Sequence, residues 1–133
     1  MIRILLAAAV LCVTAAAPAF AAPAAAQKDP PLDCKNAMIQ SDLNACAERD
    51  FQHEDALLNQ VYGAYRQTLP PDERAGLINA QKAWLTFRDA ECDFETLENI
   101  GGSIRPMEYS GCLSELTQQR RKRLETLLKD ANP

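Results

Sequence analysis

The chain has 133 residues, of which 14 are basic and 18 are acidic, and its net charge at pH 7 is −4. This length suits a single domain. The acidic balance argues against nucleic acid and anionic membrane surfaces as partners, and it favours a cationic partner.

The first 21 residues are typical of a secretory signal peptide. Arg3 gives a basic start, an apolar run covers residues 4–17, and residues 19–21, Ala-Phe-Ala, match the small-x-small pattern of a cleavage site. The run is too short for a comfortable membrane span. Cys12 lies inside it, but it is not preceded by the small residue that a lipoprotein signal needs. We therefore expect cleavage after Ala21, no membrane anchor, and a periplasmic or secreted location.

The segment after the predicted cleavage site, residues 22–33, is rich in alanine and proline. This composition predicts a flexible leader without a core of its own. We expect the folded domain to cover residues 34–130. It should open with a turn or a short helical segment over residues 34–40.

A long helix is predicted over residues 42–69, either continuous or kinked. Ser41 is suited to cap its first turn, and Gly63 would weaken it while letting a neighbouring helix approach closely. Pro70-Pro71 ends it, because proline cannot continue the hydrogen-bond ladder. Its apolar face consists of Leu43, Ala47, Phe51, Leu58, Val61, Tyr62, Tyr65 and Leu69.

The second predicted helix covers residues 72–99 and holds the only tryptophan, Trp84. Because tryptophan buries a large apolar area, we expect this helix to be the central one. Arg88 lies one turn from Trp84, so it should be partly buried and paired with an acid on a neighbouring helix. The stripe expected to face the core consists of Leu77, Ala80, Trp84, Phe87 and Phe94, widened by Ile78, Leu85 and Cys92.

Gly101-Gly102 is expected to end the second helix. A loop over residues 101–106 then leads to the last helix, residues 108–129. Five leucines of that helix should face inward: Leu113, Leu116, Leu124, Leu127 and Leu128. No segment alternates apolar and polar residues as a strand does. The predicted fold is all-α, a small antiparallel bundle of three long helices with a short N-terminal helical segment.

Four cysteines remain once Cys12 is removed with the signal peptide, namely Cys34, Cys46, Cys92 and Cys112. An even number in a small exported chain predicts two disulfides. Sequential pairing, Cys34 with Cys46 and Cys92 with Cys112, is favoured, because it clamps the helices that flank the glycine pair. The nested pairing, Cys46 with Cys92 and Cys34 with Cys112, is also geometrically possible. Because there is no C-x-x-C and only one histidine, we expect no metal and no cofactor.

No motif of a familiar catalytic class occurs, since the chain lacks a nucleophile elbow, a P-loop, an HExxH and a dinucleotide fingerprint. Asp55, Asp89 and Glu91 could meet in space as catalytic carboxylates, which would make the protein a small hydrolase. Acids on a solvated helix face are the commoner case. We therefore expect that the protein is not an enzyme.

The best candidate for contact with a partner is the loop of Gly101, Gly102, Ser103, Ile104 and Arg105. A disulfide between Cys92 and Cys112 would brace its base, and preorganisation lowers the entropic cost of binding. The alternative, held level with it, is that the loop only joins two helices.

Residues 81–92, QKAWLTFRDAEC, resemble the Q-x-x-W-x-x-[YF]-R-[DN]-x-x-C signature of the LprI-like lysozyme-inhibitor domain. Cys34 and Cys46 match the paired N-terminal cysteines of that family, and residues 57–62 resemble its LN-x-x-Y segment. Gly102-Ser103 resembles its glycine-serine turn, and residues 112–121 resemble its closing C-x-x-x-L-T-x-x-R segment. The similarity covers nearly the whole exported chain.

The resemblance implies a small, exported, disulfide-bonded helical protein that inhibits lysozyme by protein–protein contact. It also implies a scaffold role for the motif residues Gln81, Trp84, Arg88 and Tyr62. Lysozymes are commonly cationic and carry two acids in an open cleft, so an acidic protein would be steered toward them. Ser103 and Arg105 could then occupy the cleft carboxylates. The alternative hypothesis is a cell-envelope interaction module that binds a different protein or glycan and does not inhibit lysozyme.

Overall fold

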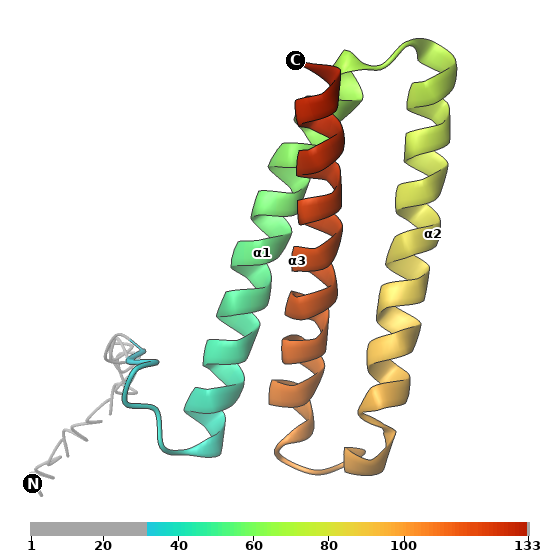
Figure 1. Ribbon diagram of the computed structural model, residues 1–133. Helices are drawn as coiled ribbons and strands as arrows, with labels where there is room; N and C mark the ends of the chain where they lie inside the picture. The colour runs from blue at the N-terminus through green and yellow to red at the C-terminus, as the bar shows by residue number, and fades with distance from the viewer. Residues whose placement is uncertain (1–31, 133) are drawn as a thin grey trace, which may run out of the picture. The chain divides into compact units, whose positions relative to one another are not determined.

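The computed structural model describes residues 32–132, and this part of the chain is all-α (Figure 1). It contains three long helices, α1 (Gln40–Thr68), α2 (Pro71–Glu95) and α3 (Arg105–Ala131), and a 3₁₀ turn, η1 (Leu97–Asn99), between α2 and α3. The predicted antiparallel bundle is confirmed. The predicted signal peptide and most of the predicted leader lie outside the described residues. Within residues 32–132, no helix combines the length and the hydropathy needed to cross a membrane.

The start of α1 differs from the prediction in its cap. The helix begins at Gln40, and no side chain caps it, so the expected cap by Ser41 is wrong. The Gln40 amide donates to the Asn44 side-chain oxygen at 2.8 Å, an i,i+4 pair that supports a helix start two residues earlier than predicted. Of the two forms considered for the segment before it, the turn is found, and the Asp33 carboxylate accepts bonds from the Lys35 N–H and the Asn36 amide.

The end of α2 and the start of α3 both fall earlier in the chain than predicted. The proline pair separates α1 from α2 as expected, but α2 ends at Glu95, because the chain tightens into η1 just after it. At this point the buried Thr96 hydroxyl donates to the Cys92 carbonyl at 2.8 Å. Gly101 then turns the chain with a φ of +80°. Pro106, which suits the first turn of a helix, lies within α3, so Arg105 is helical and the connecting loop is shorter than predicted.

The order of the helices contradicts the prediction that α2 is central. The helix between the other two is α3, and α1 and α3 are the most closely packed pair (Figure 1). The buried residues of α2 are Leu77, Gln81, Arg88 and Cys92. The predicted stripe is therefore wrong at Ala80, which is exposed, and at Phe87 and Phe94, which are 53% and 69% exposed. Polar side chains that find partners on α3 occupy the buried face instead.

The apolar core fills only one half of the bundle, the half nearer the turn between α1 and α2. It centres on the buried side chains of Leu58, Leu77 and Leu124, one from each helix. Half-buried residues that complete it are Val61, Tyr62, Tyr65, Leu69, Trp84 and Leu127. The buried residues of the other half are mostly polar or sulfur-bearing: Cys46, Arg88, Cys92, Thr96, Ser110, Leu113 and Thr117. That half therefore depends on bonds other than apolar burial.

Two disulfides reinforce the half that lacks an apolar core. Cys34 is bonded to Cys46 and Cys92 to Cys112, with a Cα–Cα distance of 5.6 Å in each pair. The sequential pairing is thus confirmed, and the nested alternative is excluded. By restricting the unfolded chain, each bridge contributes about 2–4 kcal/mol to the free energy of unfolding.

Gly63 offers a test of helix stability that is free of packing effects. A Cβ added there would meet nothing within 4 Å, so the expectation that Gly63 lets a helix approach closely is wrong. We expect Gly63→Ala to raise the free energy of unfolding by about 0.5–1 kcal/mol in urea titrations. Gly101→Ala is the matched control, because its positive φ should make the same change destabilising. A lower urea midpoint for Gly63→Ala would contradict this assignment.

A pH-dependent contact joins α1 to α3. The Arg121 Nε donates to Glu54 Oε2 at 2.9 Å, and both side chains are about 15% exposed. The hydrogen bond from Arg121 lowers the pKa of Glu54 below its ordinary value near 4.5. A carboxylate with a lowered folded-state pKa stabilises the fold above its unfolded pKa, and this stability is lost as the pH falls through the lowered value.

Glu54→Gln should therefore lower the free energy of unfolding at pH 7 by about 1–2 kcal/mol. The difference from the parent protein should shrink as the pH falls from 5 to 3, where the parent loses the same charge. Urea titrations at several pH values measure it. Glu115→Gln is the control, because Glu115 is exposed and, within residues 32–132, bonds only the Gln119 amide. A destabilisation that stayed constant from pH 7 to pH 3 would refute the role of the carboxylate charge.

Candidate partner-binding end of the bundle

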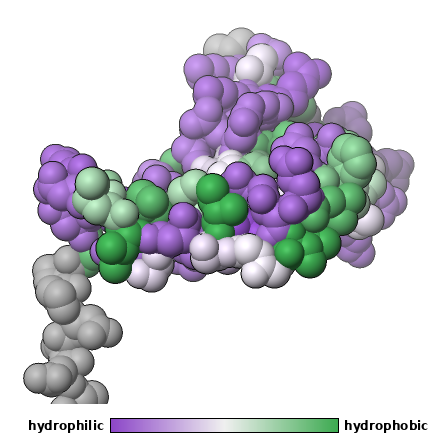
Figure 2. All heavy atoms as spheres, turned by 90° about the horizontal axis from the view of Figure 1, so that it is seen from below, coloured by the Kyte–Doolittle hydropathy of each residue, from purple (hydrophilic) through white to green (hydrophobic). Residues whose placement is uncertain are grey.

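Large apolar side chains gather at one end of the bundle, where α1 begins, α2 ends and α3 begins. We call this surface the apolar end and define it as Met38, Ile39, Phe94, Leu97, Ile100 and Ile104, which are 37% to 88% exposed. Figure 2 views the molecule from this side and shows apolar side chains lying among polar ones. Because apolar groups gathered in this way typically mark an interaction site, this surface is the strongest candidate for partner contact.

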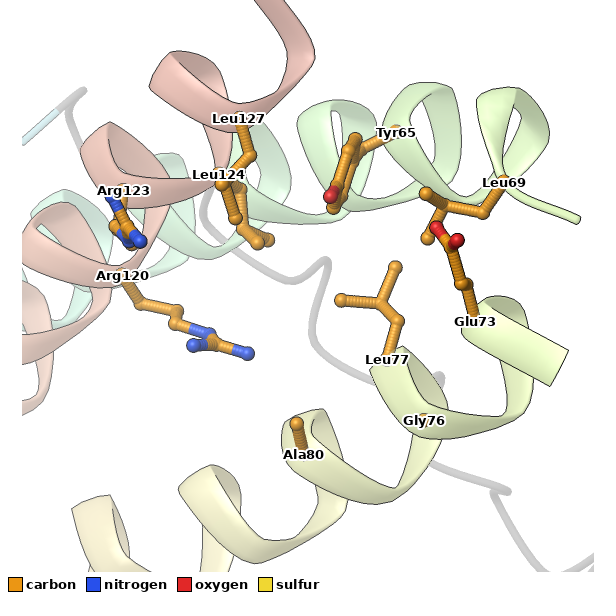
Figure 3. Close-up of a pocket in the computed structure, with 10 residues that line it drawn as sticks. All are labelled: Tyr65, Leu69, Glu73, Gly76, Leu77, Ala80, Arg120, Arg123, Leu124 and Leu127. Carbon is orange, nitrogen blue, oxygen red and sulfur yellow. The ribbon is translucent and has the colours of Figure 1, made fainter. Parts of the chain in front are cut away.

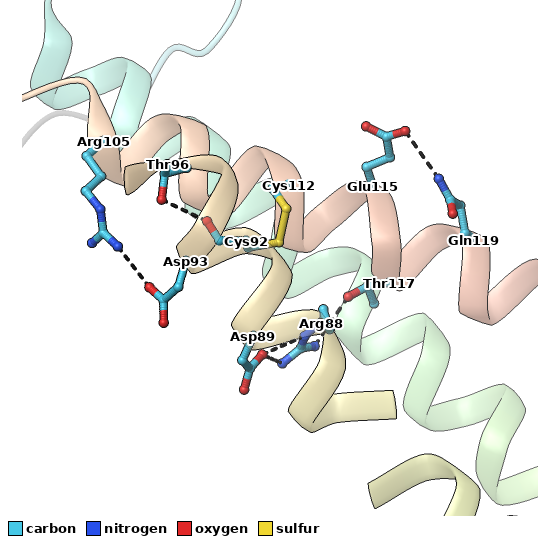
Figure 4. The surroundings of a disulfide bond; sticks show 10 residues. All are labelled: Arg88, Asp89, Cys92, Asp93, Thr96, Arg105, Cys112, Glu115, Thr117 and Gln119. Carbon is cyan, nitrogen blue, oxygen red and sulfur yellow. Dashed lines mark hydrogen bonds and ion pairs between the residues drawn. A yellow bond between two sulfur atoms is a disulfide. The ribbon is translucent and has the colours of Figure 1, made fainter. Parts of the chain in front are cut away.

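The apolar end is held rigid by covalent and polar bonds. Cys34–Cys46 ties the segment before α1 to that helix, and Cys92–Cys112 ties the last turns of α2 to α3 (Figure 4). Asn44 on α1 donates its side-chain amide to the Ser103 carbonyl at 3.0 Å, which joins α1 to the glycine turn. A surface ordered before it meets a partner loses less conformational entropy on binding.

Acidic side chains outnumber basic ones around the apolar end. The acids carried by the segments that meet there are Asp33, Asp42, Asp93, Glu95, Glu98 and Glu108, and the bases are Lys35 and Arg105. Arg105 is neutralised within the protein, because its guanidinium pairs with Asp93 at 2.8 Å and lies over the Tyr109 ring (Figure 4). Burial, followed by the charge of Asp93, raises the pKa of the Tyr109 phenol. The surface is therefore apolar with a negative rim.

The candidate loop is found at the apolar end, but its residues divide into different roles. Gly101, Gly102 and Ser103 form the turn, and a Cβ on Gly102 would come within 3.1 Å of the Asn99 carbonyl oxygen. Ile104 adds to the apolar end. Arg105 is the first residue of α3, and its side chain faces Asp93 rather than a partner.

Most members of the apolar end were missing from the sequence prediction. Phe94 was assigned to the core by its helical spacing, and Met38, Ile39, Leu97 and Ile100 lie in short segments without a regular period. The sequence feature that these residues share is that they lie next to two turns, the one before α1 and the one between α2 and α3, and each turn is close to a disulfide. That signal becomes readable only when the topology brings both turns to one end.

The motif around Trp84 lies in a network of contacts that links α2 to its neighbours. Buried Arg88 lies 5.2 Å over the Trp84 ring and donates to the fully buried Thr117 hydroxyl of α3 at 3.3 Å. It also pairs with Asp89 at 2.8 Å and with Asp55 of α1 at 3.6 Å, which confirms the predicted acid on a neighbouring helix.

Gln81 and Tyr62 complete this network of contacts. Gln81 accepts a bond from Arg120 Nε at 3.0 Å, which adds a second polar link between α2 and α3. Tyr62 packs against the apolar core. Two of the acids considered as catalytic, Asp55 and Asp89, contact the same guanidinium, and each forms an ion pair with Arg88.

The fold defines a class, a small helical domain that is closed by two disulfides. The chain belongs to the family described as "Lysozyme inhibitor LprI", which it matches over residues 33–124. It is 38% identical to the uncharacterized protein R02472 of Rhizobium meliloti (strain 1021), over 88% of this chain and 97% of that protein. It is 30% identical to the uncharacterized protein YecT of Escherichia coli (strain K12), over 70% of each chain. No solved structure matches.

Proposed function

We propose that this protein is an exported, non-catalytic inhibitor of lysozyme that acts by protein–protein contact through the apolar end. Family membership supports inhibition of lysozyme as the activity. The single observation that carries the choice of surface is a rigid, exposed cluster of six large apolar side chains. The two disulfides support an oxidising location, periplasmic or secreted. The signal peptide over residues 1–21, the leader over residues 22–33 and the domain over residues 34–130 belong to the same proposal.

The charge of the apolar end supports a cationic partner. Exposed acids next to the apolar side chains steer a basic protein toward this surface and raise the rate of association, which falls as salt screens the charges. Phe94, Leu97 and Ile100 then supply the anchors that bury apolar area on contact. Ser103 and Arg105 belong to the same surface, and Arg105 can exchange Asp93 for a carboxylate of the partner.

Inhibition of cell-wall lysis tests the activity. The purified, oxidised protein should slow the lysis of bacterial cell walls by lysozyme at micromolar concentration, and the rate of association should fall between 50 and 300 mM salt. Arg105→Ala should weaken inhibition less than a change to an apolar anchor does. Undiminished lysis at micromolar protein would refute the proposal.

The second candidate is an envelope interaction module with another cationic protein as its partner. The same acid-rimmed apolar end favours it, since that surface carries no feature that only lysozyme would fit. Binding of a different envelope protein, with no binding of lysozyme by the same preparation, would establish this alternative.

A further inference from the structure

A concave surface lies in the other half of the bundle, away from the apolar end. It is a groove of about 350 Å³ to which all three helices contribute. Four leucines line it: Leu69, which directly follows α1, Leu77 from α2, and Leu124 and Leu127 from α3 (Figure 3). Gly76 and Ala80 form the wall on α2, and their small size leaves the groove open, because a Cβ on Gly76 would meet nothing within 4 Å.

The groove also carries positive charge that no acid neutralises. Arg120 and Arg123 line it on α3, and among residues 32–132 neither forms an ion pair. Burial and the nearby Arg123 lower the pKa of Arg120, as expected for two cations held close together. Glu73 lies on the opposite side of Leu77, beside Leu69 (Figure 3), and within residues 32–132 it forms no ion pair with either arginine.

Arg120 is held in position rather than free to move. Its Nε donates to Gln81 at 3.0 Å, and its guanidinium lies 5.9 Å over the Trp84 ring. In the part of the chain that the structure describes, its two terminal nitrogens have no hydrogen-bond partner. They reach across from α3 toward α2 (Figure 3). The groove therefore has aliphatic side chains along its base and the guanidinium of Arg120 held in place beside them.

We propose that this groove binds a monoanionic amphiphile with one acyl tail, with the tail on the leucines and the carboxylate on Arg120 and Arg123. An extended peptide fits less well, because the walls are helical and their main-chain groups are already bonded within the helices. The volume lies at the low end of the range for small-molecule sites, which suits one chain rather than the two of a phospholipid.

Titration with decanoate, followed by the fluorescence of Trp84, tests this site. Decanoate should bind saturably, hexanoate more weakly by about fourfold per methylene removed, and decyltrimethylammonium at least tenfold more weakly than decanoate. Equal binding of the cation and the anion, or a response to decanoate that does not saturate, would overturn the proposal.

Two pairs of variants locate the ligand. Ala80→Leu fills the groove and should lower decanoate affinity at least tenfold, whereas Ala83→Leu, also on the exposed surface of α2, should leave it unchanged. Arg123→Gln should weaken the binding of decanoate and strengthen that of decyltrimethylammonium, because it removes one cation from the groove, whereas Lys122→Gln should alter neither. Decanoate affinity that survives both Ala80→Leu and Arg123→Gln would overturn the assignment. The proposal is independent of lysozyme inhibition, which these changes should not affect.

Discussion

Arg88→Met should lower the free energy of unfolding by about 2–4 kcal/mol. Arg88 is 7% exposed, and its guanidinium donates to the hydroxyl of Thr117, which is fully buried. Methionine fills a similar volume but leaves that hydroxyl and the Asp55 and Asp89 carboxylates without their cation. Removing one member of such a network is strongly destabilising, because its polar partners stay in place unpaired. The stacking on Trp84 and Phe51 is lost as well. Urea unfolding of the oxidised protein, followed by circular dichroism, measures the change.

Two controls separate the network from the general effect of removing an arginine. Arg49→Met removes a cation whose partner Asp50 is exposed, and it should shift the free energy of unfolding by no more than about 0.5 kcal/mol. Arg88→Lys should lower the free energy of unfolding by an amount between those of Arg49→Met and Arg88→Met, because lysine keeps the charge but lacks the planar guanidinium. If Arg88→Met is as stable as the parent protein, the polar network does not hold α2 on the bundle.

Ile100→Glu and Phe94→Glu should each weaken lysozyme binding by about thirtyfold, equivalent to about 2 kcal/mol. Both side chains are more than 60% exposed, so neither change should lower the free energy of unfolding by a comparable amount. The thermal midpoint should stay within about 2 °C of the parent. The added carboxylate also repels the acidic rim in the free protein and needs desolvation on contact. Binding titrations at low salt measure the loss.

Phe87→Glu is the matched control for this surface. Phe87 is also an exposed phenylalanine of α2, but it lies about two helical turns from Phe94, outside the apolar end. It should bind lysozyme with the affinity of the parent protein. If Phe87→Glu loses as much affinity as Phe94→Glu, the contact surface is the side of α2 rather than the end of the bundle.

The sequence was sufficient to predict the elements and their breaks. Pro70-Pro71 forbids a continuous helix on local grounds, and the number and spacing of the cysteines favoured the disulfides that form. These features depend on the backbone and on near neighbours in the chain. They do not depend on which helix packs against which.

The packing order could not be predicted, because it depends on polar partners that are distant in the chain. Two neighbouring stripes on α2 could face the bundle, and they differ by about one position. The predicted stripe contains residues 80, 84 and 87, and the observed one contains residues 81, 88 and 92. Periodicity favoured the first because it is more apolar. The observed stripe is buried because Arg88 finds Thr117 and Gln81 finds Arg120 on α3. The apolar end escaped prediction for the same reason, since its members come from three separate segments.

Hydrogen–deuterium exchange of the oxidised protein with and without lysozyme is the measurement that bears most directly on the proposed inhibitor. We predict slower amide exchange in residues 38–44 and 94–104 when lysozyme is bound, and unchanged exchange in residues 70–80 at the other end of the bundle. Protection confined to residues 70–80, or no protection anywhere at saturating lysozyme, would contradict the account.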